Sequence, residues 1–246
     1  MSELAAAQAA LKSVFGFDAF RPGQPEIIGA VLDGENVLAV MPTGSGKSLC
    51  YQLPALLRPG LTVVVSPLIA LMRDQVCQLQ QLGVEAAALN SSIEYDEVKR
   101  IRQSMRDGKL KLLYVAPERL VRPDTSEMLT NAGVGLLAID EAHCVSQWGH
   151  DFRPEYLELG KMRVALGGVQ TIALTATADA PTRQDIGAKL FDAPPRTFVR
   201  SFDRPNLRLA MRPKAAARKQ ILDFVVAHRG ESGIVYCASQ IGRAHV

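Results

Sequence analysis

The sequence predicts an α/β fold, with a mostly parallel β-sheet covered by helices on both faces. The first observation is that short apolar runs, typical of strands, alternate with helical stretches along the chain. Strands that are apolar throughout are buried on both sides, as in parallel sheets between two helical layers. The second is a glycine-rich loop that joins a strand to a helix. With 246 residues, 48% of them hydrophobic, the chain can build the core that this fold needs.

The expected elements follow one another in a regular order. Strands are predicted over residues 36–40, 61–65, 86–89, 110–115, 136–139 and 171–174. Helices are predicted over residues 5–15, 25–32, 49–57, 68–82, 95–106, 126–131, 155–166 and 181–190. Ligands of such sheets bind at the carboxyl ends of the strands, so the loops that follow the strands are the places to look for a site.

A domain boundary is predicted near residue 205, because Pro194-Pro195 and the polar run 200–205 interrupt the pattern. It separates an N-terminal helical segment (1–27) and a main domain (28–205) from the start of a second domain (206–239). That start holds one predicted helix (215–227) and one strand (233–237), too little to bury their apolar faces, so the second domain is interpreted as truncated. Residues 240–246 carry no pattern and are interpreted as a non-native tail.

The composition limits the classes of function. A net charge of +3 permits nucleic-acid binding without arguing for it, so any basic patch must be local. The four cysteines include no Cys-x-x-Cys pair, which speaks against a zinc site or a disulfide framework and fits a reducing cytoplasm. No signal peptide is recognisable, and no apolar run approaches the roughly 20 residues that span a bilayer. A cytoplasmic protein is expected.

The loop Met41-Pro42-Thr43-Gly44-Ser45-Gly46-Lys47-Ser48 carries the clearest chemistry. A strand, a glycine-rich loop and a helix start in this order are typical of a P-loop, whose backbone N–H groups and helix end hold phosphates. Lys47 would reach the β- and γ-phosphates, and the Ser48 hydroxyl would ligate Mg²⁺. Met41 stands where the usual pattern has its first glycine. The alternative is a Gly/Ser loop with a solvated lysine. Predicted nucleotide contacts are Thr43, Gly44, Ser45, Gly46, Lys47 and Ser48.

Asp140-Glu141-Ala142-His143 follows the apolar strand 136–139. An Asp-Glu pair at a strand end is the usual companion of a P-loop: Asp140 would hold Mg²⁺, and Glu141 would orient and deprotonate the attacking water. With Lys47, these residues and His143 form the predicted catalytic set. A solvated turn is the alternative for the carboxylates, and a packing or capping histidine is the alternative for His143.

Thr175 and Thr177 follow the predicted strand 171–174. Their hydroxyls are expected to hydrogen-bond the Asp-Glu loop and to respond to the γ-phosphate. The spacing fits equally well an N-cap for the helix 181–190, and both interpretations stay open.

Together these motifs resemble those of superfamily 2 helicases, and three further segments resemble the RecQ family. They are residues 20–24 (Phe-Arg-Pro-Gly-Gln), residues 144–155 with their aromatic-rich loop, and residues 201–207. The resemblance covers residues 10–239. It implies the first RecA-like domain of an ATP-dependent 3′–5′ DNA helicase of recombination and repair, in a bacterial cytoplasm or nucleoid. The family's arginine finger, zinc-binding and winged-helix regions are not in this sequence.

The resemblance also implies an adenine site at Phe17, Arg21 and Gln24. Gln24 can pair with the adenine edge, whereas Arg21 and Phe17 can stack on its face. The family often has tyrosine where Phe17 stands. The alternative is that Phe17 and Phe20 are core aromatics.

The expected partner is DNA, single-stranded or partly duplex. The resemblance implies base stacking on Trp148 and Phe152 and phosphate contacts from His150 and Arg153. Further backbone contacts would come from Ser66, Arg73 and Arg119, with Thr175 and Thr177 in a coupling role. The alternatives are that Trp148 packs its loop against the sheet and that the arginines are solvated surface charges.

Two other function classes are considered. One is a different P-loop ATPase, of the transporter or protein-remodelling type, whose turnover would ignore DNA. The other is a non-catalytic nucleotide- or DNA-binding module.

Overall fold

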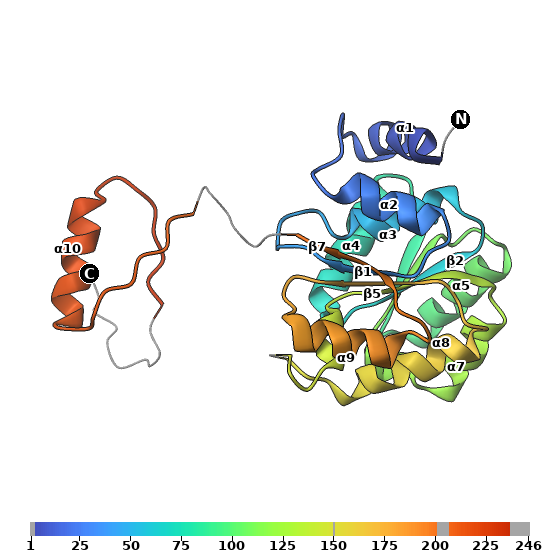
Figure 1. Ribbon diagram of the computed structural model, residues 1–246. Helices are drawn as coiled ribbons and strands as arrows, with labels where there is room; N and C mark the ends of the chain where they lie inside the picture. Colours follow the sequence, from blue (N-terminus) through green and yellow to red (C-terminus); the bar gives the residue numbers. More distant parts are fainter. Residues whose placement is uncertain (1–2, 150, 201–206, 237–246) are drawn as a thin grey trace. The chain divides into compact units, whose positions relative to one another are not determined.

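The computed structural model describes residues 3–149, 151–200 and 207–236 (Figure 1). The chain forms two compact units, Met1–Phe202 and Asp203–Val246. The division falls within residues 201–206, outside the described residues, so the boundary near residue 205 stays a prediction.

The first unit is built on a sheet of seven strands in the order β3-β4-β2-β5-β6-β1-β7. Every neighbouring pair is parallel, which confirms the predicted fold class. The strands are β1 (Val37–Val40), β2 (Leu61–Val65), β3 (Ala86–Leu89), β4 (Leu112–Val115), β5 (Val134–Ile139), β6 (Thr171–Thr175) and β7 (Arg196–Val199).

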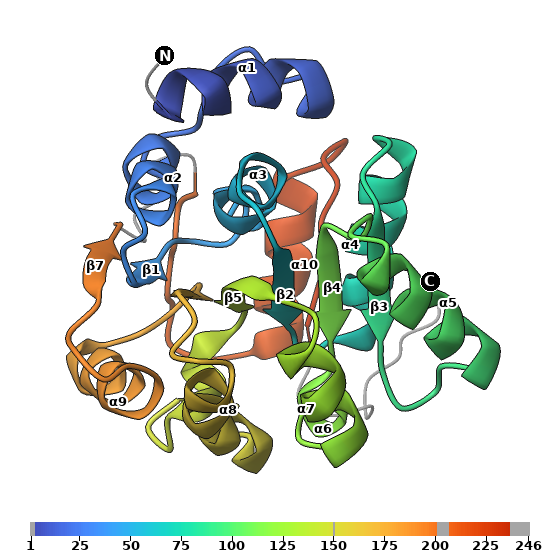
Figure 2. The same ribbon diagram turned by 90° about the vertical axis from the view of Figure 1, so that its right-hand side faces the viewer.

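Helices cover both faces of this sheet, as Figure 2 shows. The face with α1 to α4 buries Val37 and Ala39 of β1, and the opposite face buries Leu38 and Val40, because successive side chains of a strand point to opposite sides. The first layer consists of α1 (Glu3–Phe15), α2 (Gln24–Leu32), α3 (Leu49–Leu57) and α4 (Ile69–Gln81). The second consists of α5 (Tyr95–Arg106), α6 (Pro117–Leu120), α7 (Pro123–Thr130), α8 (Leu159–Ala165) and α9 (Ala180–Leu190).

Several elements differ from the sequence-based expectation, among them the short helix α6, which was not predicted. Strand β7 was not predicted, since it is a short edge strand with mostly exposed side chains directly after Pro195. The expected helix 155–166 begins as a 3₁₀ turn, Pro154–Glu158, before α8. The strand predicted over residues 233–237 is wrong for its described part, because residues 233–236 are not in a strand. A strand needs a neighbour to pair with, and the described part of the second unit offers none.

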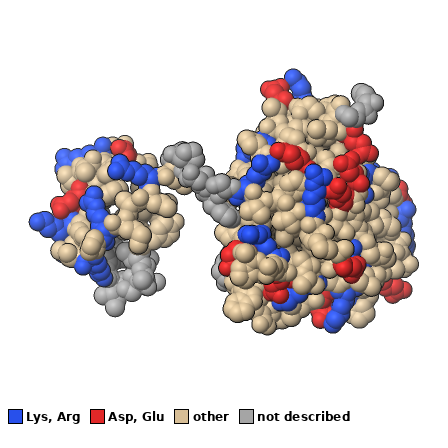
Figure 3. Space-filling model, in the orientation of Figure 1, with Lys and Arg blue, Asp and Glu red and all other residues tan. Residues whose placement is uncertain are grey.

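The second unit contains α10 (Ala217–Ala227), whose apolar side chains Leu222, Phe224 and Val226 are exposed. Several basic side chains also lie on this unit, and Figure 3 shows the charged residues in space-filling form. They are Arg208, Arg212, Lys214, Arg218, Lys219 and Arg229. Within the described ranges of the whole chain, no helix is long and apolar enough to cross a membrane.

Candidate nucleotide and nucleic-acid site

Three predicted motifs meet at the carboxyl edge of the sheet, because their strands are neighbours. The P-loop follows β1, the Asp140–His143 segment follows β5, and β6 lies between these two strands. Backbone hydrogen bonds continue past the strand ends, from Met41 N to Thr175 O (3.0 Å) and from Asp140 N to Val65 O (2.9 Å). Segments that are far apart in the sequence are thereby held side by side.

The P-loop has the left-handed backbone that its glycines permit. Gly44 and Gly46 have φ of +82° and +81°, a region that other residues rarely adopt. A Cβ on Gly46 would lie 2.5 Å from Gln24 Nε2. Close packing therefore favours glycine at this position in addition to the positive φ. Lys47 Nζ donates to Met41 O at 3.2 Å. Met41 itself is fully buried in the core, which explains an apolar residue where the usual pattern has glycine.

Asp140 is a buried carboxylate next to this loop. Its pKa is raised from 3.8 to about 6, mainly by burial and also by the charge of the neighbouring Glu141. The Glu141 backbone N–H, Lys47 and His143 act in the opposite direction. The Glu141 N–H donates to Asp140 Oδ1 at 3.0 Å, and the buried Tyr156 hydroxyl donates to Asp140 O at 3.0 Å. These two hydrogen bonds hold the main chain at Asp140 and Glu141 in place. The positive groups near the Asp140 carboxylate do not offset the cost of its burial, because its pKa remains raised.

Glu141 is the one non-glycine residue with positive φ in the part of the chain that the structure describes (φ 49°, ψ 45°). Such a conformation costs about 1–3 kcal/mol in a non-glycine residue and persists only where its surroundings impose it. The Glu141 carboxylate lies 3.3 Å from His143 Nδ1.

His143 connects this segment to β6. Its Nδ1 lies 2.9 Å from Thr175 Oγ1, and Thr175 Oγ1 donates to Thr177 O at 3.1 Å. Since the hydroxyl has a single proton, it accepts from His143 Nδ1–H. The hydrogen bond expected between the threonine segment and the Asp-Glu loop is thus present. The N-cap of α9 is Asp179, whose side chain accepts from Thr182 N at 2.9 Å.

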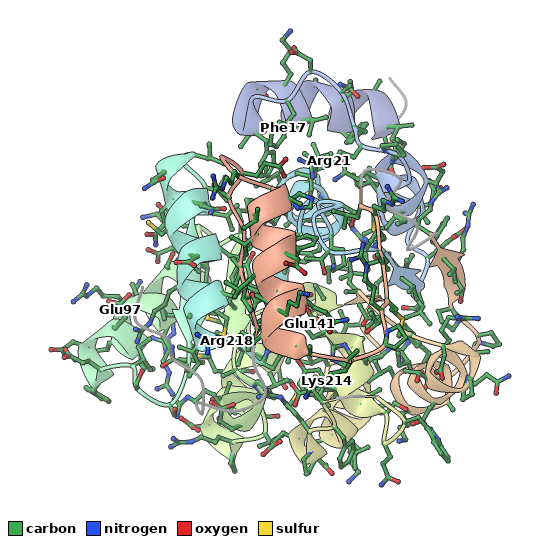
Figure 4. All side chains as sticks on the ribbon, turned by 90° about the vertical axis from the view of Figure 1, so that its left-hand side faces the viewer. Phe17, Arg21, Glu97, Glu141, Lys214 and Arg218 are labelled. Atoms are coloured by element: carbon green, nitrogen blue, oxygen red, sulfur yellow. The ribbon has the colours of Figure 1, made fainter. Side chains whose placement is uncertain are left out.

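The segment before α2 contacts the P-loop through its polar side chains. The Arg21 guanidinium donates to Gly44 O, and Gln24, only 2% exposed, donates from Nε2 to Gly46 O at 3.0 Å. Gln24 Oε1 accepts from Arg21 N at 2.8 Å. The Gln24 NH₂ group also faces Ser45 O at 3.4 Å, so donation from it to an adenine edge requires one of these bonds to be exchanged, whereas Oε1 keeps a second lone pair for an adenine donor. Phe17 is 52% exposed, and Figure 4 shows it with Arg21; Phe20 packs partly against the core.

In the aromatic-rich loop, Trp148 lies at the surface, and Arg153 connects the loop to neighbouring segments through hydrogen bonds. Trp148 is 76% exposed, so it does not pack the loop against the sheet. Arg153 donates from N to Cys144 O (2.9 Å) and from Nη1 to Pro67 O (3.4 Å), and it pairs with Asp151. Phe152 is half-buried. His150 lies outside the described residues.

The three remaining predicted DNA contacts have different surroundings. Arg73 is exposed and donates to Ser92 Oγ at 3.3 Å. Ser66 is buried at the end of β2, and its Oγ has no hydrogen-bond partner among the described residues. Arg119 is 8% exposed and pairs with Asp124 at 3.0 Å, so it is not a solvated surface charge. Its role as a DNA contact stays a prediction.

A pocket of about 350 Å³ lies where these loops meet. It is lined by residues of the P-loop, the loop after β2, the acidic segment, the aromatic-rich loop and the threonine segment, among them Thr43, Pro67, Glu141, His143, Asp151 and Thr177. The residues beneath this edge could not be recognised from the sequence. Tyr156 had no recognisable signal, and neither did Tyr51 or Tyr114, which border Asp140 closely enough for its charge to raise the pKa of each.

Comparison with known proteins gives a consistent result. The family model for DEAD/DEAH box helicases matches residues 21–186. The chain is 50% identical over 230 residues to the ATP-dependent DNA helicase RecQ of Haemophilus influenzae, covering 94% of this chain and 37% of that protein. It is 49% identical to the protein of the same name from Pasteurella multocida, covering 94% and 36%. The chain therefore spans little more than a third of these relatives.

Among solved structures, the DUF1998 helicase MrfA superposes with a TM-score of 0.67 at 19% identity, covering 96% of this chain and 39% of that one. A hypothetical ATP-dependent RNA helicase from Sulfolobus tokodaii gives 0.60 at 20%, covering 80% and 57%. At such identities the likeness concerns the fold alone.

Proposed function

The chain belongs to the DEAD/DEAH box helicase family, and we propose that it is the first motor domain of a RecQ-type, ATP-dependent 3′–5′ DNA helicase that acts in recombination and repair. One observation carries the proposal: Lys47, the Asp140-Glu141 pair and Thr175 meet at a single edge of the sheet, with His143 bonded to Thr175. The identity to proteins named ATP-dependent DNA helicase RecQ supports the use of ATP and the DNA substrate.

The P-loop would hold the phosphates of ATP. Its buried Ser45 Oγ has no partner among the described residues, and its two glycines leave the backbone open to an anion, so the residues fit this ligand. Lys47 would exchange its bond to Met41 O for phosphate oxygens.

Ser48 and Asp140 would hold Mg²⁺, which neutralises charge on the β- and γ-phosphate oxygens when bound. The fit rests on Asp140: a buried carboxylate whose pKa is raised to about 6 favours a nearby cation, because the cation stabilises its charged form.

Glu141 is proposed as the general base that orients and deprotonates the attacking water. Its backbone conformation is held by the turn, and His143 keeps a donor beside its carboxylate. His143 is also hydrogen-bonded to Thr175. A displacement of β6 or of the loop with Thr177 would therefore move His143 and, with it, the donor beside the Glu141 carboxylate. Phe17, Arg21 and Gln24 would bind the adenine.

Single-stranded DNA would run over the loops at the same edge. Trp148 and Phe152 would stack on bases, and Ser66, Arg73, Arg119, His150 and Arg153 would contact the backbone. Thr175 and Thr177 would couple these contacts to ATP. Each phosphate contact on a single strand adds about −0.7 to the slope of log affinity against log salt.

The test is the ATPase rate of the full-length protein against the concentration of single-stranded DNA. We expect stimulation by DNA and its loss in Lys47→Ala, because comparable oxyanion donors contribute roughly 3–4 kcal/mol. Lys12→Ala, which removes an exposed lysine paired with Asp18, is the control. A rate that ignores DNA would favour a transporter-type or remodelling ATPase. Nucleotide binding without turnover would favour a non-catalytic module.

A further inference from the structure

Arg200 connects the carboxyl end of β7 to the start of α2. Strand β7 lies at the edge of the sheet next to β1, and Figure 2 shows it beside α2. Arg200 N donates to Val40 O at 2.9 Å, which extends the pairing with β1 to the residue just before the P-loop. The Arg200 side chain donates from Nη2 to Glu26 Oε1 of α2 at 2.8 Å. One residue thus joins the ends of two strands to the helix that follows the proposed adenine contacts.

The Arg200 guanidinium also lies directly against Gly23, the N-cap of α2. A Cβ on Gly23 would be 2.6 Å from Arg200 Nε and 3.2 Å from Cζ, so the guanidinium occupies the space that a larger residue would need. Gly23 has a φ of +89°, and a glycine is free to leave such a conformation for many others. The guanidinium, held in place by Glu26, therefore restricts a turn that its own sequence leaves flexible.

The turn at Gly23 places the two polar residues of the proposed adenine site. Gln24 N donates to Arg21 O at 3.1 Å, and Arg21 N donates to Gln24 Oε1 at 2.8 Å, so both residues belong to the turn. Their side chains then reach Gly44 O and Gly46 O of the P-loop. The conformation of the turn consequently determines where the Arg21 and Gln24 side chains lie relative to a nucleotide bound by that loop.

A second ion pair of β7 provides a comparison. Arg196, at the amino end of the strand, pairs with Glu35 Oε2 at 2.9 Å. Both ion pairs are about half exposed, so each should contribute little to the stability of the fold. The pair of Arg196 lies at the opposite end of the strand from the P-loop, whereas Arg200 contacts the segment that carries the adenine contacts.

We propose that Arg200 is a positioning residue for adenine recognition, which holds the Gly23 turn so that Arg21 and Gln24 meet the base. The inference rests on the proposed function, because it needs a nucleotide on the P-loop with its base at these two residues. The phosphates depend on the P-loop itself, so Arg200 should affect the choice of base and leave the binding of phosphates unchanged.

The test is the affinity of this chain for ATP and GTP analogues that carry a fluorophore on the ribose, with Mg²⁺ present. Arg200→Ala should weaken the ATP analogue about fivefold, the net contribution of one hydrogen bond, and leave the affinity for the GTP analogue nearly unchanged. Glu26→Gln, which removes the partner of the guanidinium, should act in the same direction by a smaller factor. Arg196→Ala is the matched control and should change neither affinity.

The outcomes separate the inference from the proposed function. A wild-type chain that binds neither analogue would overturn both. A wild type that binds ATP and GTP analogues equally would overturn the adenine site and the inference with it. A preference for ATP that Arg200→Ala leaves intact would overturn the positioning role alone. Equal weakening of both analogues, together with a lower melting temperature by circular dichroism, would also overturn it and make Arg200 a residue of general stability.

Discussion

Removing the charge of Asp140 should stabilise the protein while it abolishes Mg²⁺-dependent function. The carboxyl has an ordinary pKa of 3.8 and a folded-state pKa of about 6, mainly because it is buried. That difference of about two pH units, at 1.36 kcal/mol each, means that the ionised carboxylate destabilises the fold by about 3 kcal/mol above pH 6. Asparagine has the same shape and can still accept the hydrogen bond from Glu141 N.

The sign determines the pH window of the effect. The folded-state pKa is raised, so the penalty is fully present above about pH 6. It shrinks as the pH falls below 6 and vanishes only below the unfolded-state pKa of 3.8, where the carboxyl is protonated in both states. We expect Asp140→Asn to raise the melting temperature at pH 7.5 in EDTA by about 6–12 °C, at 2–4 °C per kcal/mol for a domain of this size. The gain should shrink towards pH 4.5.

Thermal unfolding of wild type and variant across this range, followed by circular dichroism, is the assay. Asp74→Asn, at an exposed position of α4, is the matched control and should have no such pH dependence. An Asp140→Asn protein that is less stable than wild type at pH 7.5, or a gain that does not depend on pH, would refute the reasoning.

Three further predictions follow from the same edge of the sheet. Gly46→Ala should destabilise the domain more than Gly44→Ala: both have positive φ, at a cost of about 1–2 kcal/mol, but only the Cβ at Gly46 meets Gln24. Equal melting temperatures for the two variants would show that this contact has no energetic weight. Glu141→Gln should bind ATP normally yet hydrolyse it at least about 100-fold more slowly in the full-length enzyme, as single-turnover assays can measure; undiminished hydrolysis would contradict its role as base. Trp148→Ala in that enzyme should keep the DNA-independent ATPase rate and lose most of the stimulation by single-stranded DNA, whereas full stimulation would leave the exposed ring without a part in coupling.

The sheet and the position of the P-loop could be predicted because they depend on local patterns. Strands β2 and β3 have the predicted bounds, since apolar runs flanked by polar or glycine residues define both. The bond between His143 and Thr175 could be anticipated as well: parallel strands end at one edge, so polar groups after adjacent strands meet there.

What the sequence could not supply depends on packing between distant segments. Arg119 looks like a surface charge in a loop, but the short helix α6 directs it towards Asp124 at the start of α7. Gln24 has a side chain suited to a base edge, yet it is used by the P-loop backbone. Tyr114 lies in an apolar strand, so its sequence context predicts a packing residue. Its hydroxyl accepts a hydrogen bond from Gln52, which lies 62 residues earlier in the sequence.

We propose that DNA binding is coupled to ATP through the hydrogen bonds that hold the aromatic-rich loop in place. Tyr156, just beyond the loop, bonds Asp140 O, and Arg153 bonds both Cys144 O and Pro67 O. In the proposed complex, a base stacked on the exposed Trp148 would therefore pull on a segment whose far end is hydrogen-bonded to the acidic motif. Most of that motif is buried, but Glu141 is held at a positive φ that a relaxation of the turn would relieve. Because the surroundings of Glu141 impose its strained conformation, we expect a displacement of the loop to change the position of the proposed base.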